Sequence, residues 1–289
     1  MTTLLVFALV GLLVVYAGVL VMVWHFQEHI VFQPPAGVAV EAVPARQVRY
    51  SAADGAQLFA YVVGDSSPGG IVVLAFHGNA DIARWLVPWA TRLARQTGVT
   101  VVIPEYRGYD GLSGSPSYDS SSHDSRASLA YVRDTLKVTS GNVVYFGHSL
   151  GSGIAAELAA HEPPRSLVLQ APFSSARAMA QRLIVPGLRV LWRAISRVHF
   201  DTVARVGALT VPVWVSHGDR DLIVPVKMGR EIFTAAARPG ELLIVQRAGH
   251  NDVADVGGSA YWQWLEKAIG GVPTTTVAPR ATTRTRSAP

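Results

Sequence analysis

The chain has 289 residues and a formal net charge of +5, and 49% of its residues are hydrophobic. This length suits one large α/β domain or two small ones, and the apolar share is ample for a buried core. The absence of cysteine excludes disulfides, cysteine nucleophiles and cysteine-ligated metals, and so mild a positive charge argues against nucleic acid as the main partner.

The chain begins with a long apolar stretch. Residues 4–24 carry no charged side chain, and as a helix they would span the roughly 30 Å hydrocarbon core of a bilayer. Trp24 marks an interfacial end. A cleaved signal peptide is the alternative, but no basic residue precedes the stretch and its apolar run exceeds the usual length. We therefore expect a single-pass N-terminal membrane anchor whose orientation is left open by the sequence.

Downstream of residue 45, strand-like and helix-like segments alternate. We expect strands at 48–51, 58–63, 71–76, 100–103, 142–146, 166–170, 211–215 and 241–245, and helices at 82–97, 124–137, 154–161, 226–237 and 259–269. Asp124 is a good candidate for the N-cap of the second helix, which would follow a long loop over 104–123. Alternation of this kind predicts a mostly parallel sheet with helices on both faces, that is, an α/β fold.

The predicted organisation has four parts. Residues 1–32 form the anchor and an interfacial segment, 33–45 a linker, 46–271 the α/β domain, and 272–289 a disordered tail of low hydrophobicity. Within the domain, residues 174–200 interrupt the alternation with a mixture of arginines and apolar residues, which predicts a helical cap insertion. This cap could rest against anionic lipid headgroups or simply present a solvated arginine face.

The sequence Gly147-His148-Ser149-Leu150-Gly151 stands between a predicted strand and a predicted helix. A Gly-x-Ser-x-Gly pentapeptide alone is a weak signal, but a strand–turn–helix context is the one in which the serine serves as an exposed nucleophile. The flanking glycines suit a turn that brings strand and helix very close together. We expect Ser149 to be a catalytic nucleophile.

A serine nucleophile needs a base, and the base needs a carboxylate that fixes its tautomer. His250 follows the last predicted strand and is the candidate base. The carboxylate would come from the loop after the preceding strand, where spacing alone does not separate Asp219 from Asp221. Asp252 is expected to lie on the loop surface.

The developing oxyanion needs backbone N–H donors. One is expected from Leu150, directly after the nucleophile at the N-terminus of a helix, and the other from Asn79, in the loop after residues 71–76. His77 is expected to brace that loop rather than to transfer protons.

Several short segments together resemble one enzyme superfamily. They are Phe76-His77-Gly78-Asn79-Ala80, Tyr106-Arg107-Gly108-Tyr109, Gly114-Ser115-Pro116-Ser117, Gly147-His148-Ser149-Leu150-Gly151, Ala171-Pro172-Phe173, His217-Gly218-x-x-Asp221-x-x-Val224-Pro225 and Gly249-His250-Asn251. In these segments, which cover about residues 45–270, the chain resembles the α/β-hydrolases. It is most similar to a membrane-anchored branch that contains the fission-yeast bud-emergence homologue, the ABHD-type depalmitoylases and serine aminopeptidase-like proteins.

The resemblance implies an α/β-hydrolase fold and places the catalytic carboxylate at Asp221 rather than Asp219. One feature departs from the depalmitoylases, which are anchored through an N-terminal cysteine cluster that this chain lacks. The carry-over of a protein-palmitoyl substrate is weakened accordingly.

The resulting expectation is a membrane-anchored serine hydrolase that acts on an ester, a thioester or an amide of a small-molecule or lipid acyl substrate. The alternative is a non-catalytic, membrane-tethered interaction protein on the same fold. The same three residues could also support a cofactor-free perhydrolase or haloperoxidase side activity. No cofactor is expected. No metal site is predicted either, because His25 and His29 are better explained as interfacial residues at a helix end.

Overall fold

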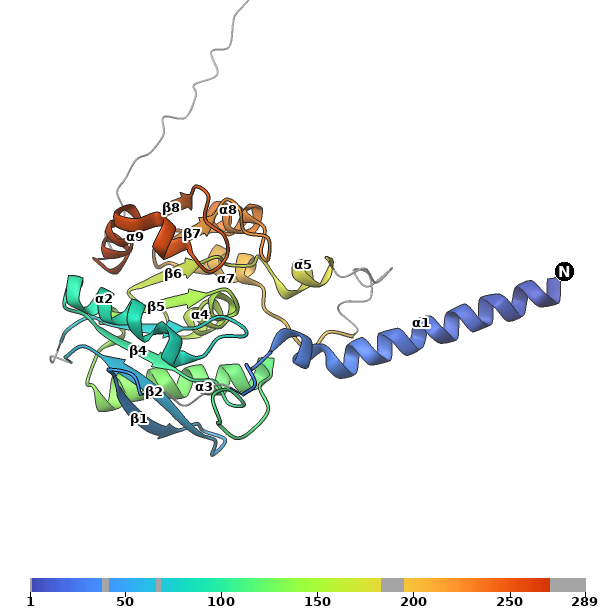
Figure 1. The fold of residues 1–289 in the computed structure, drawn as a ribbon, viewed down its shortest axis with the longest axis horizontal. Coiled ribbons are helices and arrows are strands. Elements are labelled where there is room, and N and C mark those ends of the chain that lie inside the picture. Colours follow the sequence, from blue (N-terminus) through green and yellow to red (C-terminus); the bar gives the residue numbers. More distant parts are fainter. Residues whose placement is uncertain (1, 38–41, 66–68, 183–194, 271–289) are drawn as a thin grey trace, which may run out of the picture.

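The computed structural model describes residues 2–37, 42–65, 69–182 and 195–270. Within these residues, eight strands form one sheet in the order β1-β2-β4-β3-β5-β6-β7-β8 (Figure 1). The strands are β1 (Arg46–Ser51), β2 (Gln57–Val63), β3 (Val72–Phe76), β4 (Thr100–Pro104), β5 (Val143–His148), β6 (Ser166–Gln170), β7 (Val213–Gly218) and β8 (Pro239–Val245). β1, β2 and β4 pair antiparallel, and the pairs from β4 to β8 are parallel. The predicted fold class is confirmed.

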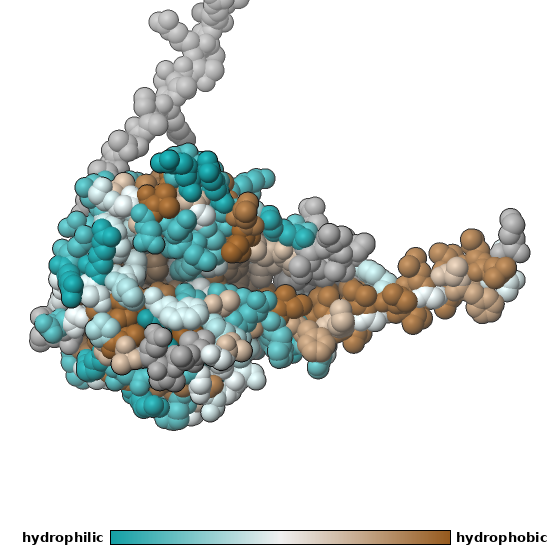
Figure 2. All heavy atoms as spheres, viewed as in Figure 1, coloured by the Kyte–Doolittle hydropathy of each residue, from teal (hydrophilic) through white to brown (hydrophobic). Residues whose placement is uncertain are grey.

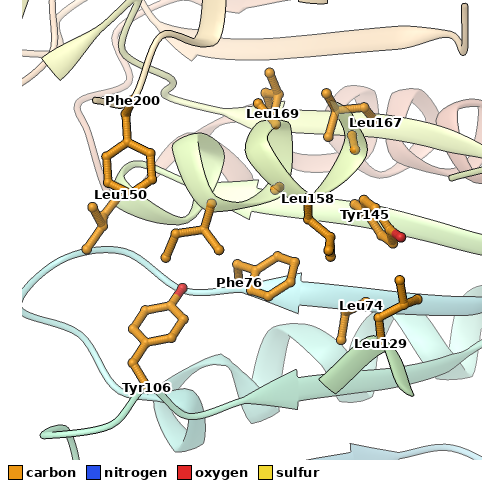
Figure 3. Close-up of a cluster of buried hydrophobic side chains, with 14 of the residues drawn as sticks. Leu74, Phe76, Tyr106, Leu129, Tyr145, Leu150, Leu158, Leu167, Leu169 and Phe200 are labelled. Atoms are coloured by element: carbon orange, nitrogen blue, oxygen red, sulfur yellow. The ribbon is translucent and has the colours of Figure 1, made fainter. Parts of the chain in front are cut away.

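Helices cover both faces of the sheet. α2 (Val87–Thr97) and α9 (Val253–Gly270) pack on one face, and α3 (Tyr118–Ala130), α4 (Leu150–His161), α7 (Thr202–Ala208) and α8 (Val226–Ala235) pack on the other. β3 shows why its run is continuously apolar: Leu74 and Phe76 enter the core on the α4 side, while Val73 and Ala75 enter the core on the opposite side. Figure 3 shows the α4 side of this core.

The strand order reverses at β3, which creates the topological switch point of the sheet. The chain leaves β3 for β4 on one side and then returns to place β5 on the other side of β3. Ligands of open α/β sheets bind at the carboxyl ends of strands on either side of such a reversal. Asn79 follows β3 and Ser149 follows β5, so both lie at this point of the sheet.

Helix starts differ from the sequence-based expectation in four places, and the simplest is α4, which begins at Leu150 rather than at residue 154. α3 begins at Tyr118, where Ser117 and Ser120 form a reciprocal capping box, so the prediction that Asp124 caps this helix is wrong. Asp124 instead lies inside α3 and binds the Arg107 guanidinium at 2.9 Å. The predicted helix over 82–97 is a short turn, η1 (Ala83–Leu86), followed by α2, and α9 begins at Val253 with a kink at Gly258. Two further short elements are η2 (Tyr131–Thr135) and η3 (Ser140–Asn142).

α1 (Thr2–Val31) projects away from the body of the protein (Figure 1). Its thirty residues make a helix about 45 Å long, which exceeds the thickness of the hydrocarbon core. The helix is long and apolar enough to cross a membrane, and most of its side chains are exposed. Its last turns contact the body, where Gln27 bonds to Ile195 and Arg197, and the helix ends at Val31, within the predicted anchor and interfacial segment 1–32.

The predicted cap is only partly visible. α5 (Ala176–Ala180) lies within it, and residues 195–200 form its end, packed against the end of α1. Residues 183–194 of the cap and the predicted tail from residue 272 lie outside the described residues.

Candidate active site

Ser149 sits in a sharp turn between β5 and α4. Its backbone has φ 50° and ψ −115°, a conformation that is strained for any residue other than glycine. The turn requires glycine on both sides: a Cβ at Gly147 would collide with the carbonyl of Gly151, and one at Gly151 would collide with the carbonyl of Phe76. The turn therefore directs the Ser149 hydroxyl away from the backbone at the carboxyl end of β5.

The structure brings Ser149, His250 and Asp221 together from three separate loops. Oγ of Ser149 lies 2.8 Å from Nε2 of His250, and Nδ1 of His250 lies 2.6 Å from Oδ2 of Asp221. An ionised carboxylate can only accept, so Nδ1 carries the hydrogen and Nε2 of the neutral ring is free to accept from the serine hydroxyl. This is the geometry required of a nucleophile, a base and an orienting acid.

The loop after β7 separates the two candidate acids. Asp219 is exposed, and its Oδ1 accepts the backbone N–H of Arg247. Asp221 is buried, and its Oδ1 accepts the backbone N–H groups of Ile223 and Val224 at 2.8 Å each. Only Asp221 contacts the imidazole of His250. Asp252 is exposed and accepts the backbone N–H of Gly249, which shapes the His250 loop.

A second histidine supports Asp221, and the sequence-based expectation did not assign it a role. Nε2 of His217 lies 3.1 Å from Oδ2 of Asp221 and 2.9 Å from the Val224 carbonyl, so this nitrogen carries a hydrogen shared between two acceptors. Burial alone would raise the pKa of Asp221. The hydrogen bonds from His217 and His250 outweigh burial and hold that pKa well below its usual range.

The two expected oxyanion donors border the same space as Ser149. Leu150 is the first residue of α4, where backbone N–H groups lack partners within the helix. The side-chain Oδ1 of Asn79 accepts the Gln33 backbone N–H at 2.7 Å and the Tyr109 hydroxyl at 3.0 Å. These two bonds fix the loop after β3, and the first ties it to the segment that follows α1. Both Asn79 and Leu150 line a cavity that also reaches Ser149.

A buried ion pair lies beneath the Asn79 loop. Nε2 of His77 lies 2.8 Å from Oε1 of Glu105, and Nδ1 of His77 lies 2.9 Å from the Gly78 carbonyl. Both ring nitrogens face acceptors, which requires a protonated ring. Burial lowers the pKa of His77, but the charge and hydrogen bond of Glu105 more than offset this and raise it. Glu105 directly follows β4, and that position at the carboxyl edge of the sheet was the signal that could have identified it.

His148 precedes the nucleophile and packs against His250, with ring centroids 5.2 Å apart. Its Nε2 lies 3.3 Å from the His250 carbonyl. Burial, together with repulsion from His250, lowers the pKa of His148 to about 4. His148 is therefore neutral near pH 7 and adds no charge beside the His250 ring.

Ser149 stands between two cavities of different character. One, of about 600 Å³, is bordered by charged and aromatic side chains that include Asp81, Arg92 and Trp262. The other, of about 270 Å³, is mostly apolar and extends towards α1. Neither takes a lining residue from the loop over 105–123. No group of three or more histidine, aspartate or glutamate side chains in the described part of the chain is placed to hold a metal ion.

Comparison with known proteins agrees with this architecture. Residues 71–194 match the family described as the alpha/beta hydrolase fold. The uncharacterized protein Rv2307c of Mycobacterium tuberculosis is 33% identical over 246 residues, covering 82% of this chain and 85% of that protein. The human alpha/beta hydrolase domain-containing protein 17B is 27% identical over 206 residues, covering 70% of this chain and 66% of that protein.

Solved structures of esterases share the fold. The Pyrococcus furiosus esterase Pf2001 superposes with a TM-score of 0.64 at 17% identity, covering 82% of this chain and 98% of that chain. The esterase RhEst1 from Rhodococcus sp. ECU1013 gives a TM-score of 0.58 at 18% identity, over 79% of this chain and 99% of that one. At such identities the likeness establishes the fold alone. The family match and the sequence relatives show that the chain belongs to the α/β-hydrolase superfamily and has ABHD-type relatives.

Proposed function

We propose that the chain is a membrane-anchored serine hydrolase that cleaves carboxylic ester or thioester bonds through an acyl-enzyme on Ser149. The single observation that carries this proposal is the unbroken relay from Ser149 Oγ through His250 to the buried Asp221, with contacts of 2.8 Å and 2.6 Å. Each side chain comes from a different loop at one edge of the sheet, and the serine is held in a strained backbone. A scaffold protein has no need for either feature.

In the proposed reaction, Ser149 Oγ attacks the substrate carbonyl while Nε2 of His250 takes the hydroxyl proton. Asp221 keeps the imidazole in the required tautomer and stabilises the imidazolium. The N–H groups of Asn79 and Leu150 are the candidate donors to the oxyanion, and each such donor contributes roughly 3 kcal/mol in the transition state. The carbon–oxygen or carbon–sulfur bond then breaks, and the leaving group takes the proton from His250. Water repeats the sequence and releases the acid and Ser149.

The anchor is proposed to be retained rather than cleaved. Gln27, near the end of α1, is buried, and its Nε2 donates to the Ile195 carbonyl at 2.9 Å. Its Oε1 accepts the Arg197 backbone N–H at 2.6 Å. Removal of α1 would leave these backbone groups of the cap unpaired. A signal peptide, by contrast, needs no specific contacts with the mature domain.

The test uses the full chain in detergent micelles with a p-nitrophenyl ester series from acetyl to palmitoyl. We expect wild type to hydrolyse at least one ester and Ser149→Ala to lose at least a thousandfold in kcat. Ser115→Ala, at an exposed serine of the loop before α3, is the matched control and should keep its activity within twofold. Absence of hydrolysis of every ester by the folded wild type would favour the interaction-protein alternative.

A further inference from the structure

The smaller cavity at Ser149 has an unusual wall. It measures about 270 Å³, and among the described residues that line it, all are apolar except Gln27, Asn79 and Ser149. Ser149 and Leu150 are among the residues that line it. Phe173 and Phe200 contribute aromatic surface, with ring centroids 6.1 Å apart. An apolar space lined by the expected nucleophile and an expected oxyanion donor suits a hydrocarbon chain attached to the reacting carbonyl.

One wall of this cavity is the membrane helix itself. Val23, Gln27, Ile30 and Val31 of α1 line it, at spacings that place them on one face of a helix. The Gln27 side chain holds this face against residues 195–197, and the Arg197 guanidinium stacks over the Trp24 ring at 5.0 Å. Arg197 also pairs with Glu28 at 3.5 Å. The wall is therefore fixed to the catalytic domain by the contacts of Trp24, Gln27 and Glu28 with residues 195–197.

The cavity lies at the level where α1 would leave a bilayer. Its first wall residue, Val23, directly precedes Trp24, the residue type that anchors at the membrane–water boundary. The apolar surface of α1 runs up to the body of the protein in Figure 2. On the loop next to Asp221, Leu222 is 90% exposed and Ile223 is 55% exposed, and Ile223 also lines the cavity. Two separate apolar elements thus border the cavity where the bilayer surface would lie.

The larger cavity at Ser149 is more polar than the smaller one. It is bordered by Asp81, Arg92, Asp255 and His250, together with tryptophans. Burying unpaired charges against a hydrocarbon chain would be costly, so a chain prefers the apolar side and a hydrated leaving group the polar side. A substrate that has an apolar acyl chain and a polar leaving group can therefore lie across Ser149 in one direction only.

We propose that the apolar cavity binds the acyl chain of a bilayer-resident ester or thioester, and that α1 is a wall of this acyl site. The anchor helix then sets which chain lengths reach Ser149, in addition to holding the enzyme at the membrane. This inference rests on the proposed hydrolase function and adds to it a substrate class and a specificity-determining element.

The experiment compares two valines of α1 in the full chain reconstituted into phosphatidylcholine vesicles. Val23→Trp places a large ring in the cavity. Val21→Trp introduces the same ring at a position that is 65% exposed and lines neither cavity. The readout is the ratio of kcat/KM for p-nitrophenyl dodecanoate to that for p-nitrophenyl acetate. We expect wild type to prefer dodecanoate. Val23→Trp should lower the ratio at least tenfold, and Val21→Trp should change it less than twofold.

Ile30→Trp repeats the test from a partly exposed position of the same wall, in case Val23→Trp does not fold. An unchanged ratio in the folded cavity variants, an equal change in Val21→Trp, or a wild type that hydrolyses only acetate would overturn the acyl site and leave the hydrolase intact. A wild type that hydrolyses neither ester and is not labelled by a fluorophosphonate would overturn the proposed function and the acyl site together.

Discussion

Nδ1 of His250 lies 2.6 Å from Oδ2 of Asp221, and Asp221 is only 8% exposed. The same carboxylate oxygen also faces Nε2 of His217, and the other oxygen accepts two backbone N–H groups. Asp221 is therefore held as a buried, ionised acceptor with its hydrogen-bonding capacity used. Its neighbour Asp219, two residues earlier, shares none of these contacts.

This difference predicts that one conservative substitution lowers kcat strongly and that the other leaves kcat almost unchanged. Asp221→Asn should lower kcat by about 10³- to 10⁴-fold, because an amide can donate to Nδ1 and stabilise the wrong tautomer of His250. Asp219→Asn keeps the oxygen that accepts the Arg247 N–H and should leave kcat within twofold. Steady-state kinetics on an ester that wild type hydrolyses distinguishes them. Equal losses in both variants would contradict the assignment of Asp221.

The turn at Ser149 predicts a stability difference between two glycines. Gly147→Ala should lower the free energy of unfolding by about 3 kcal/mol or more, because the added methyl collides with the Gly151 carbonyl, and backbone cannot easily yield. Gly141→Ala, in η3, meets nothing within 4 Å and should be nearly neutral. Denaturant unfolding followed by circular dichroism measures both. A Gly147→Ala protein as stable as wild type would show that the turn is looser than described.

His148 predicts a pH dependence of stability. Its pKa is about 4 in the folded protein, against an ordinary value near 6.5. Between these values the unfolded chain binds a proton that the folded protein does not, so the free energy of unfolding falls as the pH drops from 6.5 to 4. Above pH 6.5 His148 no longer changes the free energy of unfolding with pH, because it is neutral in both the folded and the unfolded state. The full loss amounts to roughly 3 kcal/mol.

His148→Gln removes this titration and retains a side chain able to hydrogen-bond the His250 carbonyl. We expect wild type to lose more stability than the variant between pH 7 and pH 4.5, with the other histidines contributing equally to both proteins. Denaturant unfolding at several pH values gives the comparison. Parallel stability curves for the two proteins would show that His148 titrates normally.

Much of the fold could be predicted because its strands are read directly from local pattern. β3 and the first four residues of β5 are continuous apolar runs because both of their faces are buried, and a glycine stands close after each run. The strand–turn–helix context around Ser149 is equally local. Asn79, Ser149, Asp221 and His250 follow β3, β5, β7 and β8, and their placement at one edge then follows from the geometry of a parallel sheet.

The errors arise where a local signal competes with a long-range contact. Asp124 has the side chain of a typical N-cap, but it lies inside α3 and binds Arg107. Ser117 caps the helix instead. Gln27 looks like the polar end of an anchor, yet it bonds to backbone groups about 170 residues away. No local pattern encodes such a pairing, and for that reason the contribution of α1 to the site was not predicted.

The central claim is that Ser149 is the nucleophile, and covalent labelling tests it most directly. The full chain in micelles is treated with an alkyl fluorophosphonate, digested, and analysed by mass spectrometry. We predict one phosphonylated peptide, containing Ser149, and no adduct in Ser149→Ala or after the protein has been unfolded before labelling. An adduct on another residue, or none on the folded wild type, would contradict the claim.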